Sequence, residues 1–188
     1  MAAAGHAIRA AVKVPIGFNV LRNDARAALA LCGACNGSFI RVNVHTGAML
    51  TDQGLIEGNA HDTLRCRQQL CPQTKIFADV LVKHAVPLGD LSIEDSARDT
   101  LERGLADALI ISGVGTGMAA ELSDLERVRH ACPSAKIFLG SGVTLANIHD
   151  FLSLADGFIV GTSLKRGGKI SKPVDSKRVR ALASAIGK

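Results

Sequence analysis

The chain contains no tryptophan and no tyrosine, and its six phenylalanines account for the whole 3% of aromatic residues. Proteins that bind single-stranded nucleic acid stack bases on aromatic side chains, so this shortage argues against a nucleic-acid partner. Long apolar runs are also missing, and none approaches the roughly 20 residues of a membrane-spanning helix. We therefore predict no nucleic-acid partner and no transmembrane segment. We expect a cytoplasmic protein, with organellar or peripheral membrane association left open.

Cysteine is scarce, and its number is odd. The five cysteines are scattered along the chain, which argues against the disulfide framework of a small secreted protein. Cys32 and Cys35 form a C-x-x-C motif without a second pair or a nearby histidine cluster. Zinc or redox use is one reading of this motif, but packed free thiols fit better. We predict no cofactor and no metal.

Acidic residues are absent before Asp24, although several basic residues occur there. Organelle transit peptides share this composition. The segment GHAIRAAVKVPIGFNVL, however, runs from a helical pattern directly into an apolar strand pattern. We therefore interpret it as part of the fold.

Acidic residues are also scarce near the C-terminus, where much of the net charge of +5 gathers. Asp175 is the one acid among Lys165, Arg166, Lys169, Lys172, Lys177, Arg178 and Arg180. Such a run attracts phosphate-bearing ligands or nucleic acid in some proteins, and in most it is a solvated surface. We favour the solvated surface.

Short apolar runs alternate with helical patterns along the chain. We expect strands over residues 14–21, 39–44, 75–82, 108–112, 136–140 and 157–161, each followed by a helix, and a long loop over residues 46–58. Strands that alternate with helices and are apolar on both faces form parallel sheets. Polar residues cluster after nearly every strand, which favours a TIM-barrel-type α/β fold over a doubly wound sheet. We expect residues 1–188 to form one domain, a partial barrel with six of the eight βα units.

Two turns rich in glycine and hydroxyl residues follow the last two predicted strands. In such turns, backbone N–H groups can approach an anion closely, helped by the start of the following helix. The loops after the last two strands of a (β/α)8 barrel frequently form a phosphate site. We predict phosphate binding by Ser141, Gly142, Gly161, Thr162 and Ser163. Tight turns that merely need glycine are the alternative.

Further polar residues follow the earlier strands. Asn19 and Arg22 lie at or beyond the end of the first strand, and Asn43 ends the second, so we expect all three to contact the substrate or its phosphate. The candidate catalytic residues are Asp79, Lys83, His45 and His84.

Asp79 stands inside an apolar strand, where a charge is costly to bury without a partner. Strand alternation places Lys83 on the same face as Asp79. Such a pair serves acid/base chemistry, makes the lysine a nucleophile, or is a structural ion pair, and the spacing does not decide among these. His45 and His84 are further acid/base candidates. Their spacing gives little support to a metal site.

Six segments together carry a resemblance to a known family. They are GFNVLRNDARAALAL, FIRVNVHTGAMLTDQGLIEG, KIFADVLVKHA, RDTLERGLADALIISGVGTG, FLGSGVT and ADGFIVGTSLK. They resemble the BtpA family, which includes the SgcQ proteins. The resemblance implies a TIM barrel of the ribulose-phosphate-binding-like group. One cyanobacterial branch of the family is linked to accumulation of photosystem I reaction-centre proteins, and other branches occur in organisms without photosynthesis.

Family members usually carry further βα units at the N-terminus, and this chain begins just before the strand that corresponds to their third. We therefore interpret it as an N-terminally truncated barrel, whose open sheet edges are a hazard for aggregation or homo-oligomer formation. Two functional hypotheses follow. The first is a phosphate-recognising barrel that acts on or binds a small phosphorylated sugar or nucleoside-like metabolite. The alternative is a non-catalytic biogenesis factor for photosystem I reaction-centre proteins.

Overall fold

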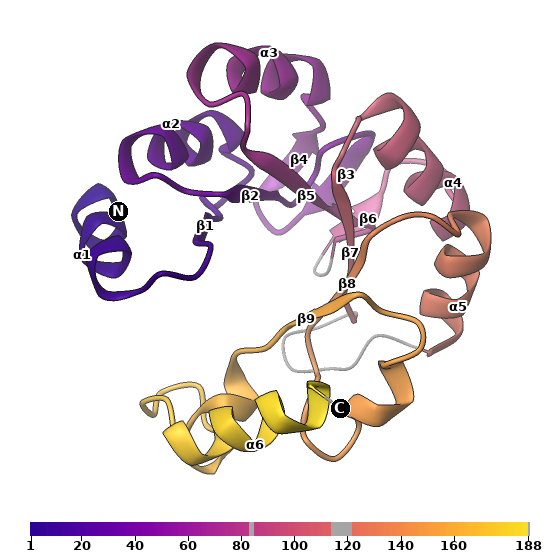
Figure 1. Cartoon of the computed structure of the whole chain (residues 1–188). Coiled ribbons are helices and arrows are strands. Elements are labelled where there is room, and N and C mark those ends of the chain that lie inside the picture. The colour runs from indigo at the N-terminus through magenta and orange to yellow at the C-terminus, as the bar shows by residue number, and fades with distance from the viewer. Residues whose placement is uncertain (83–84, 114–121, 188) are drawn as a thin grey trace.

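The main element of the fold is a six-stranded parallel sheet in the order β1-β2-β5-β7-β8-β9. The computed structural model describes residues 1–82, 85–113 and 122–187. The strands are β1 (Gly17–Phe18), β2 (Phe39–Val42), β5 (Lys75–Val80), β7 (Ala108–Ile111), β8 (Ile137–Gly140) and β9 (Gly157–Ile159). Figure 1 shows the sheet curled into an open part of a barrel, with helices along its outer side. The predicted TIM-barrel-type α/β fold with six strands is confirmed.

Helices connect most of the strands. They are α1 (Ala2–Ala11), α2 (Ala25–Cys35), α3 (Ala60–Leu70), α4 (Ile93–Arg98) with its π-helical continuation η1 (Asp99–Arg103), α5 (Leu122–Ala131) and α6 (Ser176–Ile186). Local sequence sets several of their ends. Asp24 caps α2 by accepting a hydrogen bond from Ala27 N at 2.8 Å, and Asn36 ends the helix in the left-handed conformation. Asp175 caps α6 in the same way, through Lys177 N.

Side chains alternate between the two faces of the sheet. Ile40, Ile76 and Leu109 are fully buried on the outer face, where they belong to the core that packs against the helices. On the inner face Phe77 stacks between Phe39 and Phe138, with ring centroids 4.6 and 4.8 Å apart. Three of the six phenylalanines therefore lie on the inside of the barrel.

The edges of this aromatic layer are closed by glycine. A Cβ atom at Gly17 would lie 2.2 Å from the Phe39 ring, and one at Gly157 would lie 2.5 Å from the Phe138 ring. Both glycines stand on the outermost strands, β1 and β9. The rings can lie flat against these strands because no side chain is present there.

Two parts of the chain repeat one arrangement at the amino ends of the strands. The segments CPQTKIF (71–77) and CPSAKIF (132–138) match, and so do ADALII (106–111) and ADGFIV (155–160). In the first repeat, Asp107 accepts a hydrogen bond from Ile76 N at 2.9 Å. In the second, Asp156 accepts one from Ile137 N at 2.9 Å. Each aspartate thereby fixes its own strand against an earlier one.

Each of these aspartates also binds two basic side chains. Asp107 contacts Lys75 Nζ at 2.8 Å and Arg67 Nη1 at 2.9 Å, and Asp156 contacts Lys136 Nζ at 3.1 Å and Arg129 Nη2 at 2.7 Å. We call these groups the first clamp (Arg67, Lys75, Ile76, Asp107) and the second clamp (Arg129, Lys136, Ile137, Asp156). Burial opposes ionisation of Asp156, but the bonds from Ile137 N, Arg129 and Lys136 outweigh it and lower the pKa of this carboxyl to about 2.

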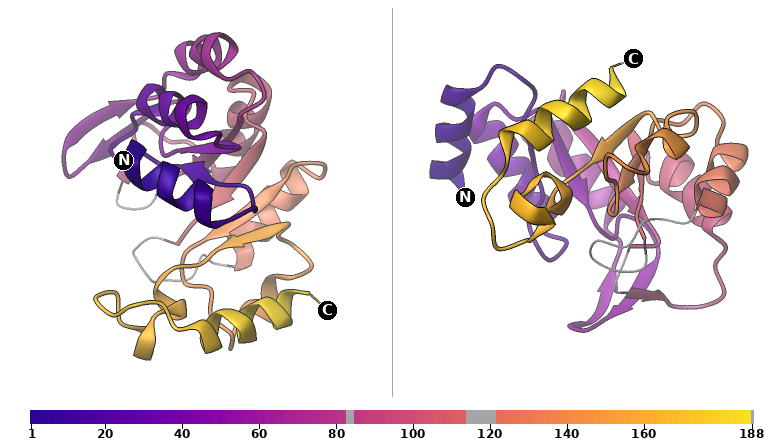
Figure 2. Two further views of the ribbon diagram at one scale, coloured as in Figure 1. Left: turned by 60° about the vertical axis from the view of Figure 1, so that its left-hand side comes forward. Right: turned by 90° about the horizontal axis from the view of Figure 1, so that it is seen from below.

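Our prediction of a long loop over residues 46–58 is wrong. This segment contains the hairpin of β3 (Ala48–Thr51) and β4 (Gly54–Glu57), and β6 (Ala85–Pro87) adds a third strand in the order β4-β3-β6. Figure 2 shows this hairpin projecting from one end of the main sheet. Its strands are short, and β3 pairs with β6 from a distant part of the sequence, so periodicity alone did not reveal it.

Two further predictions were too long. The strand expected over residues 14–21 pairs only at Gly17–Phe18, since it lies at the sheet edge and Pro15 has no N–H to donate. The helix expected between the last two strands is one short turn, η2 (Ile148–Phe151). There Asn147 Oδ1 accepts from Thr144 N at 2.8 Å, and such side-chain bonds to the backbone compete with helix formation.

Candidate functional site

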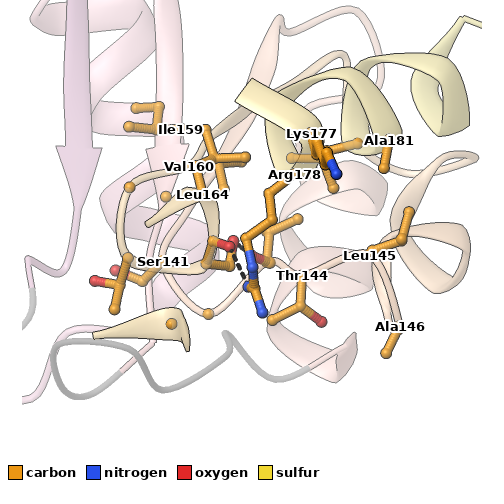
Figure 3. Close-up of a pocket in the computed structure, with 18 of the residues that line it drawn as sticks. Ser141, Thr144, Leu145, Ala146, Ile159, Val160, Leu164, Lys177, Arg178 and Ala181 are labelled. Atoms are coloured by element: carbon orange, nitrogen blue, oxygen red, sulfur yellow. Dashed lines mark hydrogen bonds between the residues drawn. The ribbon is translucent and has the colours of Figure 1, made fainter. Parts of the chain in front are cut away.

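A cavity of about 810 Å³ lies at the carboxyl ends of β8 and β9. Its walls are the loop after β8, the end of β9 with the following turn η3 (Thr162–Leu164), the start of α6, and one side chain from β2. Figure 3 shows side chains from the loop after β8, from the end of β9 and from α6 around the cavity. Its volume falls in the range of small-molecule sites, roughly 300–1,000 Å³.

The five residues predicted to bind phosphate lie together in this cavity. Ser141 and Gly142 belong to the loop after β8, and Gly161, Thr162 and Ser163 to the loop after β9. Ser163 Oγ donates to Val143 O at 2.8 Å, which ties one loop to the other. The structure therefore gathers these residues, and their role in phosphate binding stays a prediction.

The cavity is lined by cations. Arg41, Lys177 and Arg178 face it, and none of the described lining residues is Asp or Glu. Arg178 reaches from α6 to the loop after β9, where its Nη1 donates to Ser163 O at 2.7 Å (Figure 3). Positive charge on a wall that exposes no carboxylate among its described residues favours an anionic ligand.

Backbone geometry shapes the first loop. Ser141 has a φ of 126° and Gly142 a φ of 67°. A positive φ is uncommon for serine and marks a strained position, of the kind that clusters at ligand sites. Asn147 Nδ2 holds this loop by donating a hydrogen bond to Gly142 O at 3.1 Å.

Gly161 faces open space. A Cβ atom built on it would meet no atom within 4 Å. The cavity therefore has room for ligand atoms, or for a new side chain, at this backbone position.

A buried polar network lies next to the cavity. Arg41 binds Asp79 through two bonds, Nε to Oδ2 at 3.0 Å and Nη2 to Oδ1 at 2.7 Å. Asn43 Nδ2 donates to Asp79 Oδ2 at 2.8 Å, and Asn19 Nδ2 lies 3.1 Å from Asn43 Oδ1. The Asp79 side chain is 0% exposed and that of Arg41 is 19% exposed. Among the described residues, an arginine and an asparagine are thus partners of the buried Asp79.

The network gathers three of the predicted residues, Asn19, Asn43 and Asp79, and excludes a fourth. Arg22 instead forms an ion pair with Asp52 on the β3–β4 turn, with Nη2 2.7 Å from Oδ1, and both side chains are partly exposed. The prediction of a phosphate contact for Arg22 has no support from this placement. Lys83 and His84, and with them the proposed Asp79–Lys83 pair, lie outside the described residues.

His45 packs against the helix layer. It is 1% exposed, its Nε2 lies 2.8 Å from Gly104 O, and its Nδ1 has no partner among the described residues. Burial lowers the pKa of His45 below its ordinary value of 6.5. The hydrogen bond to Gly104 O acts in the opposite direction, and the charge of Arg67 lowers the pKa further. His45 is therefore a neutral, buried side chain in this structure, set against the end of η1.

Three functional residues were missed from the sequence. Arg41 interrupts the apolar run FIRVNV at a position that shares its face with Asn43, and this alternation was the available signal. Lys177 and Arg178 belong to the basic run that we interpreted as a solvated surface. Their proximity to the glycine loops depends on how α6 folds back, which no local pattern shows.

In the described part of the chain, no group of three or more His, Cys, Asp or Glu side chains is placed to hold a metal ion. Cys32 and Cys35 are free, buried thiols, and burial raises the pKa of Cys32 to about 12. No described helix has both the length and the apolar composition needed to cross a membrane.

Solved structures with a similar fold include enzymes. Phosphoribosyl anthranilate isomerase from Thermus thermophilus superposes with a TM-score of 0.65 at 14% identity, covering 100% of this chain and 80% of that one. The corresponding isomerase of Pyrococcus furiosus gives 0.64 at 12% identity, over 100% and 80% of the two chains. At such identities the likeness establishes the barrel fold alone.

Sequence relatives are much closer. A cyanobacterial protein of Synechocystis, "Photosystem I biogenesis protein BtpA", is 50% identical over 175 residues, which are 93% of this chain and 61% of that protein. An uncharacterised protein of Thermococcus kodakarensis is 45% identical over 97% of this chain and 69% of its own length. The putative sgc region protein SgcQ of Escherichia coli is 32% identical over 89% and 62%. This chain thus spans about three fifths of the cyanobacterial relative.

The family model of the BtpA family matches residues 1–188. The match covers the strands, the cationic cavity and the buried network alike. The chain belongs to the BtpA family.

Proposed function

We propose that this chain binds a small phosphorylated metabolite of the sugar or nucleoside-like class. Its phosphate is held by the loops after β8 and β9 together with Lys177 and Arg178. The observation that carries this proposal is the cavity at the carboxyl ends of the strands, lined by cations and, among the described residues, by no carboxylate.

The position of the cavity supports a phosphate. β8 and β9 are the last two strands of the sheet, and the loops after the final strands of TIM barrels frequently bind this group. Small residues in both loops let backbone N–H groups come close to the anion.

The charge supports it as well. Asp79 neutralises Arg41, whereas neither Lys177 nor Arg178 is in an ion pair with another described residue. Two positive charges without an ion-pair partner in the described part of the chain match a phosphate monoester, which carries about −1.5 to −2 at pH 7.

A matched pair of variants tests the proposal. Arg178→Gln removes a cavity cation, and Arg180→Gln removes the same charge from the exposed side of the same helix. Inorganic phosphate should raise the melting temperature of the parent chain and of Arg180→Gln with concentration, because a ligand stabilises the state that binds it. Arg178→Gln should need about tenfold more phosphate for the same shift. Identical responses of the two variants would count against the site.

A second candidate function rests on the 50% identity to the cyanobacterial photosystem I biogenesis protein. In that case the chain would support assembly of reaction-centre proteins through protein contacts. Co-purification with reaction-centre subunits from a photosynthetic host tests this second candidate directly. A failure to co-purify from such a host would weaken it. Arg178→Gln separates the two candidates, since a purely protein-binding role should survive loss of the phosphate site.

A further inference from the structure

Arg41 is held where the buried network meets the cavity. Its side chain starts on β2, which is separated from β8 by β5 and β7, and nevertheless lines the cavity beside the β8 loop. A Cβ atom at Gly140 would lie 3.8 Å from Arg41 Nη2. The guanidinium therefore lies within van der Waals distance of the base of this loop.

Asp79 fixes the guanidinium of Arg41 but accepts hydrogen bonds from only some of its N–H donors. Asp79 occupies Nε and one hydrogen of Nη2, which orients the planar group as a two-bond pair does. No hydrogen bond joins Nη1 to any residue that the structure describes. One edge of the arginine thus keeps N–H donors for a ligand in the cavity it lines.

This edge carries donors but little net charge. Asp79, with a fully buried side chain, balances the charge of Arg41. The other two lining cations, Lys177 and Arg178, come from α6 and have no ion-pair partner among the described residues. The cavity wall therefore combines two cations from α6 with an arginine from β2 whose charge is paired with Asp79.

We infer that Arg41 recognises the unphosphorylated end of the ligand. The site then takes a phosphate monoester whose other end presents an uncharged oxygen, a hydroxyl or a carbonyl, as a phosphorylated sugar does. A bisphosphate fits less well, because its second phosphate would meet the neutralised arginine. The volume of about 810 Å³ leaves space for a ligand much larger than phosphate alone. This inference rests on the proposed function, since it names the ligand class of the same cavity.

Calorimetric titration with three probes tests it, using inorganic phosphate, ribose 5-phosphate and fructose 1,6-bisphosphate. In the parent chain, ribose 5-phosphate should bind at least tenfold more tightly than phosphate and more tightly than the bisphosphate. Arg41→Lys keeps a positive charge beside Asp79 but loses the planar donor edge. It should weaken ribose 5-phosphate about tenfold and change phosphate binding less than twofold. Arg178→Gln should weaken both probes.

The outcomes separate this inference from the proposed function. If no probe binds the parent chain, both fail. If phosphate binds and ribose 5-phosphate gains nothing over it, or if Arg41→Lys weakens both probes equally, the role of Arg41 is refuted while the phosphate site stands. Where Arg41→Lys does not fold, the double variant Arg41→Met/Asp79→Leu replaces the buried pair without leaving a lone charge, and the same loss of discrimination is expected.

Discussion

The two repeats of this molecule are alike at one end of the barrel and different at the other. At the amino ends of the strands, the first and second clamps place an aspartate, a lysine and an arginine in the same arrangement. At the carboxyl ends, KIFAD ends in Asp79 and KIFLG ends in Gly140 at the corresponding position. One repeat thus supplies a buried charge, and the other an open loop.

The difference shows how the barrel divides its work. In TIM barrels the amino ends of the strands serve stability and the carboxyl ends carry the site. Here both corresponding positions lie beside one side chain: Asp79 binds the Arg41 guanidinium, and Gly140 lies next to it at the base of the loop after β8. The two repeats are therefore alike at the amino ends, where they hold strands together. They differ at the carboxyl ends, where they meet the cavity.

The largest effect on stability should come from a substitution of Asp79, at the carboxyl end of the first repeat. Asp79→Leu leaves the mostly buried Arg41 without its counter-charge, and we expect a loss of about 3–5 kcal/mol in the free energy of unfolding. Arg41→Met/Asp79→Leu should recover most of this loss. Urea denaturation measures both, and a double variant as unstable as the single one would show that the lone charge is not the cause.

The clamps should respond equally to equal changes. Asp107→Asn and Asp156→Asn each weaken two ion pairs while keeping an oxygen for the strand N–H, so we expect losses of about 1–2 kcal/mol apiece. The clamps share no residue, and the double variant should therefore show additive losses. Strongly unequal losses would contradict the equivalence of the two clamps.

Low pH should remove the contribution of the second clamp to stability. The pKa of Asp156 is about 2 in the folded chain against an ordinary 3.8. The stability it provides is fully present above pH 3.8 and is lost as the pH falls towards 2. The difference in unfolding free energy between the parent chain and Asp156→Asn should shrink over this interval.

A smaller, pH-dependent effect is expected at His45, which lies in neither clamp. Its pKa is lowered in the folded chain, so below pH 6.5 the unfolded chain binds the proton first and stability falls. His45→Gln keeps an N–H donor for Gly104 O and should reduce this loss of stability below pH 6.5. The exposed His130 provides the control, and a His130→Gln variant with the same reduction in pH dependence would refute the assignment.

The sequence predicted those features that depend on local chemistry. Glycine and hydroxyl residues marked the two loops that share a cavity. Features that depend on strand pairing were missed. Arg41 meets Asp79 only once β2 lies beside β5, and β3 needs β6 as its partner. His45 was expected at the site because it follows Asn43, yet it is buried against η1.

The most direct test of the cationic cavity uses Gly161, because a side chain there meets no atom within 4 Å. Gly161→Asp adds a negative charge to the cavity, and Gly161→Asn adds the same shape without it, so that any steric or backbone effect is shared. We would titrate both variants and the parent chain with inorganic phosphate by calorimetry. We predict that Gly161→Asp weakens phosphate binding tenfold or more, while Gly161→Asn stays within threefold of the parent chain. Equal binding by the two variants would contradict a phosphate site between these loops.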